Sequence, residues 1–177
     1  TSPDRERIAC IDGLLPHLPN GAAIAGKLTP AVREQVLAAM PELKERAKTL
    51  IELIDAASFI WTARPLALDE KAGTILDADA RALLKRLHAI LVETEWTIEA
   101  TEAAVKAFAE AEGLKLGKVA QPLRAALTGR STSPGIFDVL MVLGREERLG
   151  RIADQAACSS ARPGLSRTAD HAYPHPT

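Results

Sequence analysis

Two arginines and a short polar loop between apolar runs are the residues best suited to bind a ligand. Arg124 lies in "QPLRAALTG", Arg130 follows Gly129, and a Ser-Pro-Gly turn at residues 133–135 precedes the apolar run "IFDVLMVL". A guanidinium presents its N–H donors in a planar fork that suits phosphates and nucleobase edges. The loop at residues 128–135 therefore predicts a site for an anionic or hydrogen-bonding partner. The alternative is a helix corner whose arginines are only solvated.

The charge around this loop differs from that of the whole chain. The 177 residues carry 22 basic and 23 acidic side chains, a net charge of -1, and a composition of 47% hydrophobic and 25% charged residues that is typical of a soluble globular protein. Residues 66–112 hold five basic and ten acidic residues. Residues 113–151 hold seven basic and three acidic residues, a local charge of +4. The polar loop lies in the basic part.

The elements that must position the loop are helices. Aromatic residues are scarce, with three Phe, two Trp and one Tyr, while alanine and leucine are abundant, which favours an all-α fold. Thr29 before Pro30 predicts a capped helix start, and a second helix is expected from Pro41. That second helix would carry one apolar stripe formed by Leu43, Ala47, Leu50, Ile54, Ala57 and Trp61. Residues 64–79 contain proline and glycine and predict a connecting segment.

The second half of the chain predicts four or more further helices. Asp77 or Asp79 caps a helix over residues 80–95, and Thr97 caps one that ends at Gly113. A helix after Gly117 should hold Pro122 near its first turn and end at Gly129, since an interior proline costs about 3 kcal/mol. Ser133 is expected to cap a helix that starts at Pro134 and ends at Gly144, and another helix follows over residues 145–155.

Other chemistries find little support in the sequence. Cys10 and Cys158 match no metal-ligand spacing and are expected to be reduced thiols, and the four histidines add no ligand pattern. Residues 21–27 match the G-x-x-x-x-G-K of a phosphate-binding loop, but Leu28 stands where the motif needs Ser or Thr. The sequence shows no membrane helix or signal peptide, so we expect a cytoplasmic protein. We assign no catalytic residue and no metal ligand.

Long motifs identify a family. The run "GLKLGKVAQPLRAALTGRSTSPGIFDVLMVLGREERLGRI", residues 113–152, resembles the C-terminal anticodon-binding domain of bacterial glutamyl-tRNA synthetase in its alphaproteobacterial form. "LLPHL", "LKERAKTLIEL" and "RPLALDEKA" resemble the preceding helical part of the same region, and the similarity runs in order from about residue 8 to residue 157. The resemblance implies an α-helical cage of two small subdomains that binds the anticodon of the glutamate tRNA.

The resemblance also implies roles for particular residues. Arg124 falls at the arginine that contacts anticodon nucleotides, and Arg46 falls where an arginine reads the third anticodon base. Lys106 falls at a position near the anticodon that is often basic. The positions against which anticodon bases pack are Ser133, Pro134, Ile136 and Phe137. The residues alone leave an alternative to RNA contact at two of these positions. Phe137 would then pack in the core, and Arg46 would be a solvated side chain opposite Glu42 or Glu45.

The resemblance divides the chain and sets expectations for its partners. The subdomains are expected at residues 1–72 and 73–157, and the Ser-, Pro- and Arg-rich residues 158–177 should be a disordered tail. The "HIGH" and "KMSKS" motifs of the synthetase are absent, so ATP and Mg²⁺ would belong to a catalytic domain and this chain alone should not charge tRNA. The expected partners are the anticodon stem-loop and that catalytic domain, with the chain a monomer. The alternative is a helical interaction or dimerisation module without RNA binding.

Overall fold

The computed structural model describes residues 2–157, and every regular element within them is a helix. The all-α prediction is confirmed, whereas the predicted tail at residues 158–177 lies outside the described residues. The elements in chain order are α1 (Pro3–Leu14), η1 (Leu15–His17), α2 (Gly21–Lys27), α3 (Pro30–Arg46), α4 (Leu50–Ala57), η2 (Ser58–Ile60), α5 (Glu70–Ile75), α6 (Ala78–Glu93), α7 (Ile98–Ala111), α8 (Leu116–Thr128), α9 (Ile136–Leu143) and α10 (Arg145–Ala157).

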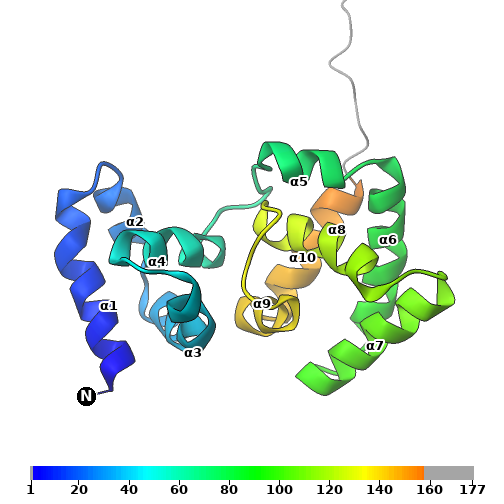
Figure 1. The fold of residues 1–177 in the computed structure, drawn as a ribbon, viewed down its shortest axis with the longest axis horizontal. Helices are drawn as coiled ribbons and strands as arrows, with labels where there is room; N and C mark the ends of the chain where they lie inside the picture. The colour runs from blue at the N-terminus through cyan, green and yellow to red at the C-terminus, as the bar shows by residue number, and fades with distance from the viewer. Residues whose placement is uncertain (1, 158–177) are drawn as a thin grey trace, which may run out of the picture.

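The helices form two groups joined by one extended segment. Figure 1 shows α1 to α4 on one side and α5 to α10 on the other, with residues 61–69 crossing between them. We call these groups the first half and the second half. The predicted boundary between residues 72 and 73 falls within α5, which packs on α8. That boundary stays a prediction.

Side-chain caps explain where most of the helices begin. The predicted caps Thr29, Asp77 and Thr97 each accept a hydrogen bond from the backbone N–H three residues later, at 3.2, 2.8 and 3.1 Å. Such a bond satisfies one of the free amides of a first helical turn. Thr49 and Asp69 cap α4 and α5 in the same way. Gly113, Gly129 and Gly144 adopt positive φ angles just after α7, α8 and α9, as expected for helix ends.

Two predictions that relied on proline as a boundary are wrong. Helix α3 continues through Pro41 to Arg46, and α4 begins only after Thr49, so the predicted apolar stripe belongs to two helices. The break at residues 47–49 has a physical cause, because the Glu52 carboxylate accepts from Lys48 N at 2.7 Å while Thr49 caps α4. Helix α8 begins at Leu116, which places Pro122 in its interior rather than its first turn.

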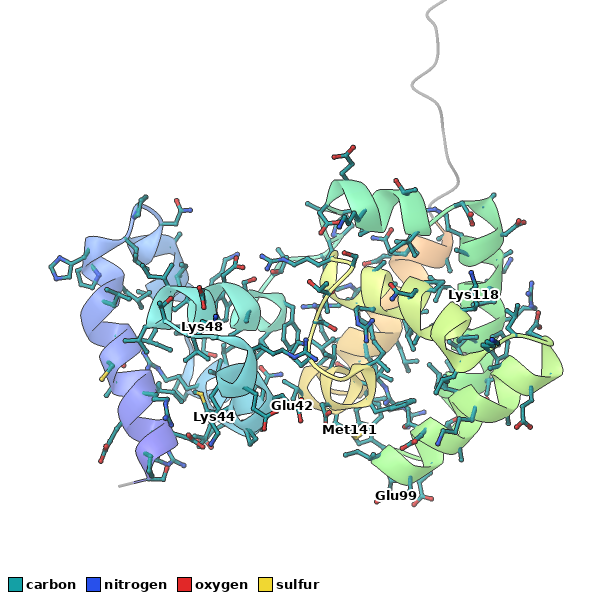
Figure 2. All side chains as sticks on the ribbon, viewed as in Figure 1. Glu42, Lys44, Lys48, Glu99, Lys118 and Met141 are labelled. Carbon is teal, nitrogen blue, oxygen red and sulfur yellow. The ribbon has the colours of Figure 1, made fainter. Side chains whose placement is uncertain are left out.

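The buried apolar side chains form one cluster that extends through both halves. Met40 and Leu43 of α3 are fully buried in the first half, and Leu84, Leu87 and Leu91 of α6 are fully buried in the second. The first half contacts the second through α3 and α9, where Gln35 Nε2 donates to Val142 O at 2.9 Å. Figure 2 shows Glu42 of α3 and Met141 of α9 on the facing sides of the two halves, and both line a shallow apolar groove there.

A buried arginine of α10 connects the halves. Arg151 is only 1% exposed, and its Nη1 donates to Phe59 O and Leu127 O at 2.7 Å each. Its Nη2 donates to Thr62 O at 3.2 Å, and its Nε donates to Glu147 at 2.8 Å. Phe59 and Thr62 follow α4, whereas Leu127 belongs to α8. One buried side chain therefore satisfies carbonyls of both halves.

A second arginine of α10 is equally buried but lacks such partners. Arg148 is fully buried, and within residues 2–157 none of its three guanidinium nitrogens has a hydrogen-bond partner. Its guanidinium carbon lies 2.9 Å from the centre of the Trp96 ring. Burial, and then the nearby charge of Arg145, lower the pKa of Arg148 to about 10. The cation–π contact with the face of the Trp96 ring is the main interaction that compensates Arg148 for its lost hydration.

These two arginines predict opposite effects of the same substitution. Arg151→Met should lower the free energy of unfolding by about 3 kcal/mol or more, because two buried carbonyls and one half-buried carbonyl lose their donor. Arg148→Met should leave the free energy of unfolding unchanged or raise it by about 1 kcal/mol, because it removes an unpaired buried charge and the thioether still contacts Trp96. Urea unfolding of both variants checks this. Equal losses of stability would show that Arg151 does not connect the halves.

Candidate nucleic-acid interface

A polar cleft opens where the two halves meet. It has a volume of about 280 Å³ and lies between the ends of α3 and α4 and the segment that joins α8 to α9. Arg46 lines it from the last turn of α3, and Asp55 lines it from α4. The opposite wall consists of residues 128–134. In Figure 1 the segment between α8 and α9 runs along the side of the second half that faces α4.

Two arginines in this region have no salt-bridge partner among the described residues: Arg46, which lines the cleft, and Arg124, which does not line it but bonds Ser133 of the cleft wall. Arg124 of α8 donates from Nε to Ser133 Oγ at 3.0 Å. Its two terminal nitrogens take no part in that hydrogen bond. Burial, and then the positive charge of Arg46, lower the pKa of Arg124. Within the described part of the chain, neither forms a salt bridge, including the one considered between Arg46 and Glu42 or Glu45. An anionic group would relieve their mutual repulsion.

Arg130, which lines the same cleft, has a different role, because its guanidinium is already bonded to a carboxylate. Its two terminal nitrogens donate to the two carboxylate oxygens of Asp55 at 2.9 Å each, and Nη2 also reaches Ser58 Oγ at 3.3 Å. The hydrogen bonds from Arg130 lower the pKa of Asp55 below its usual value. The pair joins residues 75 positions apart, one from each half.

Ser133 does not cap a helix, which corrects the prediction. Helix α9 begins at Ile136, and its N-cap residue, Gly135, makes no side-chain capping bond. The Ser133 hydroxyl instead accepts from Arg124 and donates to Pro134 O at 2.8 Å. Among the described residues, no amide of the first turn of α9 donates to this hydroxyl. Ser133 instead attaches Arg124, which does not itself line the cleft, to the cleft wall.

Gly129 sets the path of the segment that forms the cleft wall. Its φ of 72° lies in the left-handed region, and a Cβ atom there would come within 2.5 Å of Ala67 O. Its carbonyl accepts from Asp69 N at 2.9 Å. The end of α8 is therefore pressed against the chain that connects the two halves, and only glycine fits this position.

The other predicted site residues occupy varied surroundings. Pro134 is buried and lines both the cleft and the neighbouring apolar groove, Ile136 is buried in the core, and Phe137 is half-buried against the core. Lys106 is exposed on α7, where it forms an i,i+4 ion pair with Glu102, and the described residues that line the cleft do not include it. The structure thus brings together Arg46, Arg124, Ser133 and Pro134. The RNA contacts assigned to all seven residues stay predictions.

The local charge of +4 is not spread over one surface. Of the seven basic residues at positions 113–151, Arg148 and Arg151 are buried, Arg130 is paired with Asp55, and Arg145 donates to Val92 O at 2.7 Å. The charge count alone therefore overstates the basic surface. Of these seven described residues, only Arg130 lines the cleft.

Five cleft residues were absent from the sequence-based site. They line the cleft from α4 and η2 and are Glu52, Asp55, Ala56, Ser58 and Phe59. They lie more than 70 positions from Arg130 and within a helix whose pattern predicts only packing. No local motif marks them, so only the tertiary fold brings them to the site.

The described residues show no other centre. They contain no group of three or more His, Cys, Asp or Glu side chains that could hold a metal ion. Residues Gly21–Lys27, which matched part of the phosphate-loop pattern, form α2 after the η1 turn. No helix in residues 2–157 is long and apolar enough to cross a membrane.

Comparison with known proteins assigns the family. Residues 11–156 match the family described as "Anticodon binding domain". The chain belongs to this family. As an anticodon-binding domain it is similar to the glutamate–tRNA ligase of Bradyrhizobium sp. (strain ORS 278), with 60% identity over 156 residues, and to glutamate–tRNA ligase 1 of Xanthobacter autotrophicus, with 61% identity. Each match covers 88% of this chain and 33% of the relative, so the chain spans about a third of the length of these relatives.

A solved structure has the same arrangement of helices. The crystal structure of a glutamate tRNA ligase from Elizabethkingia meningosepticum, in complex with its amino acid, matches with a TM-score of 0.66 at 26% identity. The match covers 82% of this chain and 30% of that one. The resemblance to the anticodon-binding region of this ligase family is thereby confirmed.

The Gly129 geometry yields a prediction with a matched control. Gly129→Ala should lower the free energy of unfolding by about 2 kcal/mol, because the left-handed φ and the contact with Ala67 O both oppose a side chain. Gly117→Ala lies in the same helix with open space around it, so it should raise the free energy of unfolding by about 0.5 kcal/mol. Thermal or urea unfolding compares them. A Gly129→Ala variant as stable as wild type would contradict the close approach.

Proposed function

We propose that this anticodon-binding domain recognises the anticodon loop of the glutamate tRNA as part of a glutamate–tRNA ligase. The observation that carries the proposal is the cleft lined by Arg46, with Arg124 bonded to Ser133 of its wall; among the described residues neither arginine forms a salt bridge. Similarity to glutamate–tRNA ligases over most of the chain supports the choice of tRNA as the anion. The comparisons lend no support to the dimerisation alternative.

The cleft suits the chemistry of an unstacked RNA loop. Proteins recognise such loops by separating the bases, packing them on planar or apolar side chains and bonding their edges, while basic groups contact the phosphates. Arg124, oriented by Ser133, presents donors to a base edge or phosphate, and Arg46 faces it from α3. Pro134 and Phe59 form an apolar wall shared with the neighbouring groove. Phe137 would support this wall from the core.

The remaining parts of the reaction belong elsewhere in the enzyme. Because the chain spans a third of its relatives, we assign ATP, Mg²⁺ and amino-acid activation to the rest of the ligase, and this domain needs no cofactor. The domain works as a monomer in the cytoplasm, joined to that catalytic part. The contribution of this domain is to bind the anticodon end of the tRNA and so position the tRNA on the enzyme.

Removing the cleft arginines should weaken RNA binding specifically. Arg124→Ala and Arg46→Ala should each raise the dissociation constant of a glutamate tRNA anticodon stem-loop roughly tenfold, because each removes a charged donor from the cleft. Fluorescence anisotropy at two salt concentrations measures this, and binding should weaken steeply at higher salt. A stem-loop altered at the third anticodon base should bind more weakly to the wild type but equally well to Arg46→Ala.

Lys85→Ala supplies the matched control for charge. Lys85 is exposed on α6, forms no salt bridge within the described residues and does not line the cleft, so its loss changes the net charge equally but should leave affinity within about twofold. Circular dichroism confirms that each variant keeps its helices. Equal losses of affinity in all three variants would show that the binding depends only on nonspecific charge. An Arg124→Ala variant with wild-type affinity would contradict the cleft as the RNA-binding site.

A further inference from the structure

We propose that the Arg130–Asp55 ion pair is a positioning element that sets the width of the RNA-binding cleft, and that neither residue contacts RNA. This inference rests on the proposed function, since the cleft is the site assigned to RNA. Arg130 and Arg46 both line this cleft, and Arg124 is bonded to Ser133 of its wall, but the inference gives Arg130 a different role from the other two.

Both terminal nitrogens of Arg130 are already hydrogen-bonded, although 41% of its side chain is exposed. Both of its terminal nitrogens bond the Asp55 carboxylate at 2.9 Å, which is the parallel two-bond arrangement that arginine and carboxylate favour. Ser58 Oγ accepts a further bond from Nη2 at 3.3 Å. The guanidinium is thus held by α4 and η2 of the first half, while its backbone belongs to the second.

The backbone of Arg130 is fixed as firmly as its side chain. Arg130 N donates to Thr128 Oγ1 at 3.2 Å, and the preceding Gly129 carbonyl accepts from Asp69 N at 2.9 Å. Further along the same segment, Ser133 is bonded to Arg124 of α8. The cleft wall is therefore attached to α8 at one point and to α4 at another, so the pair determines how far Arg124 lies from the first half.

The sign of one substitution distinguishes positioning from simple electrostatics. Asp55 is a carboxylate at the rim of a site for a polyanion, and its side chain is 67% exposed. If only charge mattered, Asp55→Asn would strengthen RNA binding, because it removes a repulsive charge and frees Arg130. If the pair positions the cleft wall, Asp55→Asn weakens RNA binding despite the more favourable net charge.

The test measures the affinity of the anticodon stem-loop for Asp55→Asn, Arg130→Asp and the double variant Asp55→Arg with Arg130→Asp. Each single variant should raise the dissociation constant roughly threefold to tenfold, and the exchanged pair should recover most of the wild-type affinity. Glu99→Gln is the matched control for loss of a carboxylate. Glu99 lies at the far end of α7 in Figure 2 and should give affinity equal to or slightly better than wild type.

Two results would overturn the proposal. Equal or tighter binding by Asp55→Asn would show that its carboxylate only repels RNA. A double variant no better than Arg130→Asp alone would mean that Arg130 contacts the RNA directly, since an aspartate there would repel phosphates even with the pair restored.

Hydrogen exchange without RNA separates this inference from the proposed function. Amides of residues 129–135 should exchange faster in Asp55→Asn and return to the wild-type rate in the double variant. If the wild type binds no stem-loop, the proposed function fails, yet this exchange pattern still supports the pair as the element that holds the segment. Unchanged exchange in Asp55→Asn overturns the pair's positioning role whatever the RNA result.

Discussion

The buried guanidinium of Arg151 is the interaction on which the arrangement of the two halves depends. Its donors face Phe59 O on the first half, Thr62 O on the connecting segment and Leu127 O on the second half, and Arg151 itself is 1% exposed. A buried carbonyl that loses its hydrogen-bond donor destabilises the folded state. The helices therefore cannot separate without exposing these carbonyls or leaving them without a donor. The cleft exists because this bond network fixes α8 and α10 against the chain that follows α4.

The same residue type serves four purposes within one small domain. Arg151 satisfies backbone carbonyls, Arg148 packs on an indole ring, Arg130 pairs with Asp55, and Arg124 keeps its charge uncompensated by any carboxylate among the described residues. Burial and partners decide which role is possible. A guanidinium whose bonds are already made is structural, whereas one held by a single serine at an open cleft is available to a ligand.

The sequence predicted the local features of this fold better than the long-range ones. The caps Thr29, Asp77 and Thr97 were predictable because each acts on an amide three residues away. The continuation of α3 through Pro41 was not, since a tertiary core that buries Met40 and Leu43 outweighs the cost of one proline. The Arg130–Asp55 pair escaped prediction because its members lie 75 positions apart. The family motif, rather than any periodicity, drew attention to Arg46, and the structure places it on the cleft whose wall includes Ser133, the partner of Arg124.

Photo-crosslinking of a glutamate tRNA stem-loop that carries 4-thiouridine in the anticodon tests the central claim most directly. The account predicts that mass spectrometry will locate the crosslinks in peptides covering residues 46–59 and 124–137, on both walls of the cleft. An excess of a stem-loop without the label should remove them. Crosslinks confined to one half, or spread over α1, α2 and α6, would contradict an RNA site formed where the two halves meet.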